Sequence, residues 1–316
     1  DPWLSGHSIS YYYFGYVMVS VLVQLSGVPP SIAFNLALAL LFALTAIGAY
    51  SLVFNLVAKS ENGRGERGLT KAFLFAPLGA LFVLLLGNLE GVLEILHSHG
   101  FGGRDFWGWV AVDGLGNPYQ GSSWYPSEQG WWWWRATRLI NTFVGGHGVD
   151  YTIEEFPFFS FKLGDMHPHV LALPLGLLAL ALSFQFLSAK PLADGTEGIS
   201  RRVLLGYHWG RIVAVMLILG SLGFANSWDF PTHLLIFFVA VAVAQYRRQP
   251  TLGRHSVGRL LLFAVVVGFG AVLLYLPFYT EFRSQASGLL PVPAPGTRPF
   301  HYGVFWGIFL FAVGSI

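Results

Sequence analysis

The chain has 316 residues, no cysteine and a formal net charge of +2, with 54% hydrophobic and 11% charged residues. Its mean hydropathy is +0.57. A chain this apolar cannot hide its hydrophobic surface in a water-soluble globule of this length, so the composition excludes a soluble enzyme and predicts an all-α polytopic membrane protein. The lack of cysteine excludes disulfide bonds and thiolate chemistry. The sequence also shows no basic patch of the kind that binds nucleic acid.

Nearly charge-free stretches recur along the chain, each near the length that crosses a hydrocarbon core. We expect six complete spans, at 31–58, 72–89, 170–189, 212–228, 230–246 and 260–280, and a seventh that begins near Tyr302 and is cut off at Ile316. Asp1 stands in place of an initiator Met, and with the interrupted last span this indicates a piece of a longer chain.

The basic residues cluster in alternate connections between these spans. Twelve of the 18 Lys and Arg residues fall in three short connections, namely Lys59, Arg64, Arg67 and Lys71, then Lys190, Arg201, Arg202 and Arg211, then Arg247, Arg248, Arg254 and Arg259. The positive-inside rule places such connections in the cytoplasm. We therefore expect a protein of a prokaryotic plasma membrane, lodged in the lipid bilayer, with its functional face outside.

Four regions follow from this topology. Residues 1–30 form an outer juxtamembrane segment, 31–97 two transmembrane helices, 98–167 an outer Trp-rich loop domain, and 168–316 the remaining spans with an outer loop at 279–301.

The first region contains a short apolar run after Tyr11-Tyr12-Tyr13. Tyrosine is enriched at headgroup level, which favours a helix lying on the outer membrane surface, with Tyr12 as a candidate contact for a lipid phosphate. The alternative is a further span that places Asp1 inside. We prefer the surface helix because 31–58 already has to run from outside to inside.

The loop at 98–167 is rich in aromatics, including the run Trp131 to Trp134. Disordered segments are poor in aromatics, so we expect this loop to be folded onto the membrane face. The tryptophans are either an interfacial anchor or a stacking surface for a sugar or lipid. Arg135 and Arg138 lie three residues apart and share one face of a helix, where they could bind phosphate.

The motif Asp165-Met166-His167-Pro168-His169 follows this loop. Pro168 disfavours helix at His167 and suits the first turn of the next helix, so Asp165 and His167 are expected in extended chain just outside the membrane. Asp165, His167 and His169 then share a face. Such a set either binds a divalent metal such as Mg or Mn, or presents donors to a phosphate. The alternative is that these side chains only cap a helix and hydrogen-bond locally.

Several acids are further candidates for the site. Glu155 is a candidate general base or metal ligand, or else a solvated loop acid. Glu90 and Glu94 lie one turn apart with His97 on the same face; we expect Glu90 to be buried and partnered, and Glu94 and His97 to be interfacial.

A third cluster contains Asn226 and Asp229, with His233 one turn further on. Asp229 stands between two apolar segments, so its carboxylate either faces water in a cavity, pairs with a neighbour or caps the next helix.

Taken together, these motifs resemble the YYY-type family of polytopic membrane proteins, named for a Tyr-Tyr-Tyr sequence. The matching pieces cover nearly the whole chain: 1–3, 11–16, 35–39, 87–91, 155–161, 164–169, 226–229 and 231–232. The family pattern also has Glu-Lys and Asp residues upstream of Asp1-Pro2-Trp3, and this chain begins after them.

That family is thought to resemble the GT-C superfamily of membrane glycosyltransferases, which use polyprenyl-phosphate sugars at the outer face. The resemblance implies a GT-C-like helical bundle with outer juxtamembrane helices. It also implies that an acid removes a proton from the acceptor, that Asp165, His167 and His169 hold a metal or the donor phosphate, and that Arg135 or Arg138 neutralises the departing phosphate. Glu90 and Asp229 would line the cavity. On this interpretation the catalytic candidates are Glu155, Asp165 and Asp229, and Asn226 joins Glu90 among the candidates for substrate binding.

Two other functional classes remain open. One is a non-enzymatic membrane subunit that docks a membrane-protein partner or a cofactor through its Trp- and His-rich outer face. The other is a transporter, which we favour less because the acids collect at the ends of the spans rather than near their midpoints.

Overall fold

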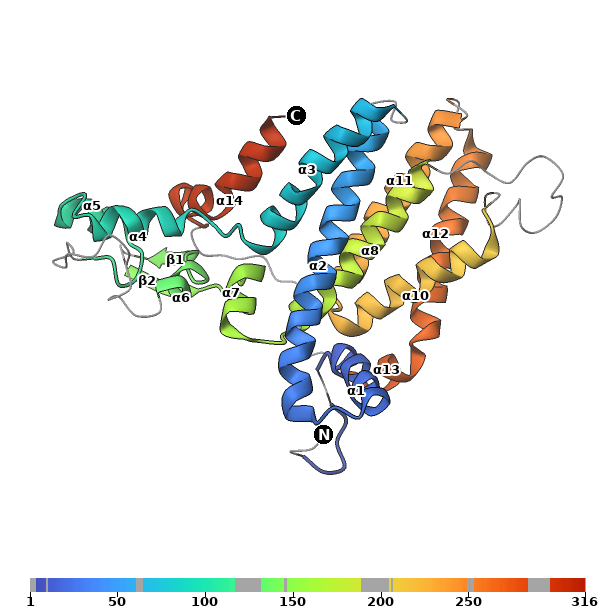
Figure 1. Ribbon diagram of the computed structural model, residues 1–316, viewed down its shortest axis with the longest axis horizontal. Helices are drawn as coiled ribbons and strands as arrows, with labels where there is room; N and C mark the ends of the chain where they lie inside the picture. The colour runs from blue at the N-terminus through green and yellow to red at the C-terminus, as the bar shows by residue number, and fades with distance from the viewer. Residues whose placement is uncertain are drawn as a thin grey trace. The chain divides into compact units, whose positions relative to one another are not determined.

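The computed structural model describes residues 4–9, 11–60, 65–116, 132–144, 147–188, 205, 207–248, 250, 253–283 and 296–315. Trp131 and most of the predicted outer loop at 279–301 lie outside these ranges. The predicted all-helical membrane architecture is confirmed, because helices make up most of the described chain (Figure 1).

Two compact units divide the chain. Unit 1 comprises Asp1–Leu84 and Gly164–Ser287, and unit 2 comprises Leu85–Leu163 and Gly288–Ile316. The described helices of unit 1 are α1 (Phe14–Ser26), α2 (Pro30–Ser60), α3 (Glu66–Leu84), α8 (Pro168–Ser188), α10 (Trp209–Ala225), α11 (Asp229–Arg248), α12 (Arg254–Leu274) and α13 (Leu276–Glu281). Unit 2 contains α4 (Glu90–Ser98), α5 (Arg104–Val110), α6 (Trp132–Ala136), β1 (Asn141–Val144), β2 (His147–Tyr151), α7 (Pro157–Leu163) and α14 (Pro299–Gly314).

Among the described helices, five are long and apolar enough to cross a membrane: α2, α3, α8, α11 and α12. Two further predicted spans correspond to shorter apolar helices, α10 with 17 residues and α14 with 16. Two boundaries also differ from the sequence prediction. Helix α3 ends at Leu84, before Gly87 and Asn88. Helix α12 ends at Leu274, and the separate helix α13 begins at Leu276 with Pro277 in its first turn.

The core of unit 1 lies among α8, α10, α11 and α12. Phe186, Phe237 and Phe263 are fully buried there, with the ring of Phe237 5.0 Å from that of Phe186 and 6.1 Å from that of Phe263. Helices α10 and α12 approach closely at Gly220, where an added Cβ would lie 2.4 Å from the carbonyl oxygen of Ala271. Small residues commonly permit such close approach of membrane helices.

Helix α1 lies across one end of the unit 1 bundle (Figure 1). Its one buried residue is Gly15, and Val17, Val21, Leu22 and Leu25 are exposed. An exposed apolar helix of 13 residues has the length and surface of an interfacial helix, and this placement outside the membrane core stays a prediction.

The two ends of unit 1 differ in their side chains. We call the end that carries Tyr11, Asp165, His167 and Asp229 the Tyr-His end. The opposite end is the basic end; its described residues include Lys59, Arg67, Lys71, Arg211, Arg247, Arg248 and Arg254.

Unit 2 has its own core, built around the buried side chains of Trp107, Leu115 and Leu139. The Trp107 indole nitrogen donates to the Phe101 carbonyl at 2.7 Å. Helix α14 joins this core although it follows more than 130 residues later, and His301 Nε2 donates to the Val110 carbonyl at 2.8 Å. A short antiparallel hairpin, β1 with β2, completes the unit.

Candidate functional site

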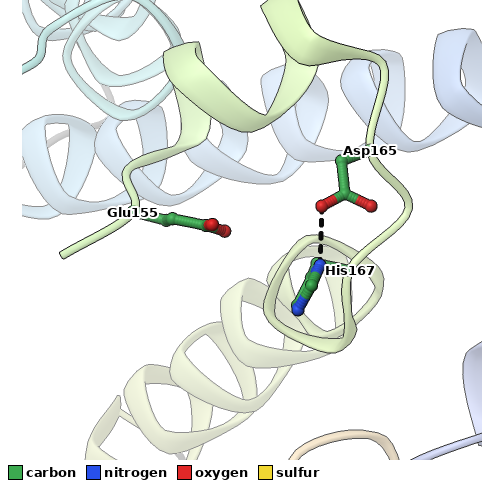
Figure 2. A group of neighbouring side chains, drawn as sticks. All are labelled: Glu155, Asp165 and His167. Atoms are coloured by element: carbon green, nitrogen blue, oxygen red, sulfur yellow. Dashed lines mark hydrogen bonds and ion pairs between the residues drawn. The ribbon is translucent and has the colours of Figure 1, made fainter. Parts of the chain in front are cut away.

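The Asp165 motif forms a hydrogen-bonded pair at the start of α8. His167 Nδ1 donates to Asp165 Oδ2 at 2.6 Å, and the side chains are 46% and 32% exposed respectively. Figure 2 shows the Asp165 carboxylate directed at the His167 ring, at the first turn of the helix. As predicted, residues 165–167 are not helical and α8 begins at Pro168.

The first backbone hydrogen bonds of α8 are accepted by His167. Its carbonyl oxygen accepts from the amides of Val170 and Leu171, both at 3.0 Å. The Asp165–His167 hydrogen bond is itself local, so it agrees both with the structural alternative and with a functional pair.

Three further groups surround this pair. The Tyr11 hydroxyl lies 3.4 Å from His167 Nε2, and the Tyr16 hydroxyl donates to the Met166 carbonyl at 2.7 Å. Burial, followed by the negative charge of Asp165, raises the pKa of the Tyr16 hydroxyl. The half-buried ring of His169 lies 5.5 Å from that of His167.

Aromatic rings continue this surface at the Tyr-His end. Tyr12 stacks on Phe282 at 5.6 Å, and Tyr13 meets the rings of Phe224 and Phe278 edge-on. The residue that we predicted as a lipid-phosphate contact, Tyr12, thus lies within an aromatic cluster of unit 1.

Asn226 and Asp229 come together where α10 ends and α11 begins. Asn226 Nδ2 donates to Asp229 Oδ2 at 3.2 Å, and His233 Nδ1 donates to the Asp229 carbonyl at 2.8 Å. Of the sequence alternatives for Asp229, the structure shows pairing, with the amide of Asn226. Its predicted catalytic role stays a prediction.

The acids of unit 2 are more buried than the sequence suggested. Glu90, Glu94 and His97 form one buried face of α4, so the two residues expected at the membrane interface are covered by protein; their depth in the membrane stays a prediction. Glu94 Oε1 accepts from Arg135 Nε at 2.7 Å, and His97 packs edge-on against Trp107. Glu94 has a charge partner and His97 a packing partner inside unit 2, and helix periodicity alone does not predict either partner.

Burial, and then the negative charge of Glu94, raises the pKa of Glu90 well above its ordinary value, while the charge of Arg135 lowers it. The two carboxyl groups thus favour holding a proton between them. Asn88 fixes this end of α4, because its Oδ1 accepts from the Glu90 amide and its Nδ2 donates to the Ala136 carbonyl.

Arg138 occupies a different setting in the same unit. Its guanidinium carbon lies 3.5 Å from the ring centroid of Trp134, and Nη1 donates to Thr137 Oγ1 at 2.6 Å. Burial lowers the pKa of Arg138, whereas the charges of Glu155 and Glu154 raise it. Glu155, also drawn in Figure 2, belongs to unit 2 and lies just before α7. Phosphate binding by Arg135 or Arg138 remains a prediction.

A family model described as "Uncharacterized membrane protein (DUF2298)" matches residues 1–316. The chain belongs to this family. Its members are integral membrane proteins by that description, in agreement with the five span-length apolar helices. No curated protein and no solved structure matches the chain significantly.

The hydrogen bond of the Asp165 pair determines which atom of His167 is available for chemistry. A carboxylate only accepts, so Nδ1 carries the proton and Nε2 is the basic nitrogen of the neutral ring. An imidazole oriented by a carboxylate in this way serves as a general base in proteins. The same arrangement suits a metal-binding histidine whose second nitrogen is held by a carboxylate. Asp165 and His167 thus fit a proton-transfer site, or a metal site in which His167 Nε2 binds the ion and Asp165 holds Nδ1; metal binding by the predicted set with His169 stays a prediction.

Some residues of the site were not anticipated. Tyr11 and Tyr16 approach residues 166 and 167 from about 150 positions away, and no spacing in the sequence could show this. The stacking of Arg138 on Trp134 has a local signal, because residues four apart are neighbours on a helical turn.

The unusual pKa of Glu154 gives a testable pH dependence. Burial raises this pKa from 4.5 to about 7. Hydrogen bonds from the backbone amides of Ile140 and Leu139 and the positive charge of Arg138 lower it, but less strongly than burial raises it. The folded state therefore binds this proton more tightly than the unfolded state, and the resulting stability is present below pH 4.5 and lost as pH rises through about 7. We expect the thermal unfolding midpoint of unit 2 to fall between pH 5 and pH 8, modestly because the group is half-exposed.

Differential scanning fluorimetry of the purified chain and of Glu154→Gln checks this prediction, since the glutamine cannot ionise. The unfolding midpoint of the variant should fall less steeply with pH than that of the wild type. The difference between the two midpoints should therefore grow as the pH rises. An identical pH slope in both proteins would show that Glu154 does not contribute to it.

Proposed function

We propose that this protein is a membrane glycosyltransferase that takes a sugar from a polyprenyl-phosphate donor at the Tyr-His end of unit 1. The observation that supports this most directly is the Asp165–His167 hydrogen bond at the end of an apolar helix, with both side chains partly exposed. A hydrophobic donor diffuses in the bilayer, so a base at the start of a span meets its phosphate and sugar near headgroup level.

The chemical step needs a base at the acceptor hydroxyl. In the proposal, His167 Nε2 takes the hydroxyl proton while Asp165 stabilises the imidazolium that forms. The acceptor oxygen bonds to the anomeric carbon of the sugar, and the bond from that carbon to the phosphate oxygen breaks. The electron pair leaves with the phosphate, which releases polyprenyl phosphate.

The aromatic surface near this pair suits both parts of such a donor. The rings of Tyr11 and Tyr12 lie 5.6 Å apart by their centroids, and each carries a hydroxyl group. Aromatic rings pack on isoprenoid chains and on the apolar faces of sugars, and tyrosine hydroxyls can hydrogen-bond to phosphate or sugar oxygens. The positive-inside rule predicts that this end faces outside.

A divalent metal would be held by His167 Nε2, with Asp165 orienting the ring through Nδ1, and would stabilise charge on the donor phosphate; His169 is a further candidate ligand. Proton transfer and metal binding compete for Nε2, so activity in the presence of a chelator discriminates between them.

The test uses the full chain in lipid nanodiscs. Native mass spectrometry measures binding of undecaprenyl phosphate, and liquid chromatography with mass spectrometry follows consumption of undecaprenyl-phosphate mannose and glucose in the presence of a membrane extract as acceptor. Binding together with donor consumption supports the proposal, and loss of consumption in EDTA identifies a metal-dependent enzyme. A folded protein that neither binds undecaprenyl phosphate nor consumes a donor would overturn the proposal and favour a non-enzymatic subunit.

A further inference from the structure

A cavity of about 760 Å³ lies between the second halves of α2 and α8, at the basic end of unit 1. The two helices pack side by side in this unit (Figure 1). The candidate site described above lies at the opposite end of α8, so the cavity is separate from it. Its volume is in the range of small-molecule and lipid headgroup sites.

The polar lining of the cavity is ordered along both helices. Ser51, Asn55 and Lys59 recur every fourth residue of α2 and therefore share one face, and Gln185 and Ser188 lie three residues apart on α8. A polar stripe on helices of this apolar character is costly where it faces lipid tails, so it indicates a polar occupant.

Lys59 provides the positive charge of this stripe. Its ammonium group donates to Ser188 Oγ and lies 5.1 Å from the ring centroid of Phe184. These contacts hold the ammonium at the cavity, and a lysine ammonium has three donors, so donors remain for an anion. Asn55 Nδ2 donates to the Ser51 carbonyl at 2.7 Å, which fixes the orientation of its amide.

The remaining lining is apolar. Leu52, Leu178, Ala181 and Leu182 form the hydrocarbon part of the cavity beside the polar stripe. A free phosphate ion would have no use for this surface, whereas an acyl chain would cover it. Basic pockets between membrane helices are a recognised kind of site for anionic lipid headgroups.

We propose that this cavity binds an anionic phospholipid, with the headgroup phosphate on Lys59 and Gln185 and an acyl chain along Leu178 and Leu182. The proposal is independent of the sugar-transfer proposal, because it concerns other residues and its test does not measure transfer.

Native mass spectrometry of the full chain, titrated with phosphatidylglycerol and with phosphatidylethanolamine, tests this site. We expect phosphatidylglycerol to bind more tightly, and Lys59→Met to weaken its binding about fivefold, as for one basic residue near an anionic lipid surface. Lys59→Arg should retain the preference. The matched control is Arg254→Met, which removes an exposed charge at the same end without touching the cavity and should bind as the wild type does.

The opposite outcomes are equally defined. If Lys59→Met and Arg254→Met weaken phosphatidylglycerol binding equally, the lipid is attracted by the general positive charge of this end, and the proposed site is wrong. Displacement of the lipid by millimolar glycerol 3-phosphate would show a soluble phosphate ligand and overturn the lipid assignment. If Lys59→Met fails to fold, Gln185→Leu takes its place. This variant removes an amide from the lining, and its phosphatidylglycerol binding is compared with that of Arg254→Met in the same way.

Discussion

Replacing His167 with glutamine is expected to lower the rate of sugar transfer by about 10²–10⁴-fold, the usual contribution of a positioned general base. Glutamine keeps a polar side chain near Asp165 but cannot accept a proton at neutral pH. Binding of undecaprenyl phosphate should persist, because the aromatic surface around Tyr12 is unchanged. Donor consumption by the variant in nanodiscs, compared with wild type, measures this loss.

Asp165→Asn should have a smaller effect than His167→Gln. The asparagine oxygen can still accept from His167 Nδ1, but it no longer offers a negative charge to the imidazolium. A charge-assisted hydrogen bond contributes about 1.5–3 kcal/mol, which corresponds to roughly 10–100-fold in rate. If instead Asp165 and His167 both ligate a metal, the two variants should lose metal-dependent binding to a similar extent.

The control for both variants is His255→Gln, an exposed histidine on α12 at the basic end. Its activity should match the wild type. Unchanged donor consumption by a folded His167→Gln would exclude this histidine as the base.

The sequence predicted the membrane helices and the setting of the Asp165 motif because both depend on local rules. Long apolar runs determine a span regardless of what packs beside it. Pro168 restricts the residue before it, which is why Asp165 and His167 precede the helix as expected. Even the shared face of Glu90, Glu94 and His97 follows from helix periodicity.

The remaining features depend on partners that are distant in the sequence. Burial of Glu94 and His97 requires Arg135 and Trp107, and hydropathy around α4 does not show that these residues will cover it. Helix α14 packs into the core of unit 2 only near its start, through His301 and Val304, whereas Phe309, Phe311 and Val313 are exposed. Composition predicts that this segment is apolar, but not which of its residues pack against the protein.

The buried ion pair of unit 2 gives the second large expected effect. Arg135→Met should destabilise unit 2 by about 3–5 kcal/mol, the usual cost of leaving one partner of a buried pair without its counter-charge. Glu94 is fully buried, and its neighbour Glu90 already favours the protonated form. Without the guanidinium, the two carboxyl groups would face each other with nothing to offset their desolvation and repulsion. Hydrogen exchange of α4 and α6 measures this loss of stability, and protection should fall by about 10²–10⁴-fold for such a cost.

A second substitution separates the charge from the packing. In the Arg135→Met, Glu94→Gln double variant the buried charge is gone, so much of the lost protection should return, because apolar replacement of a whole buried pair is often tolerated. Arg104→Met, an exposed arginine of the same unit, should change protection little. Equal protection in Arg135→Met and Arg104→Met would mean that Glu94 is solvated or neutral without its partner, and that α4 does not depend on the pair. Rescue by the double variant would instead show that unit 2 places a carboxyl pair in its interior and relies on Arg135 to keep one of the two ionised.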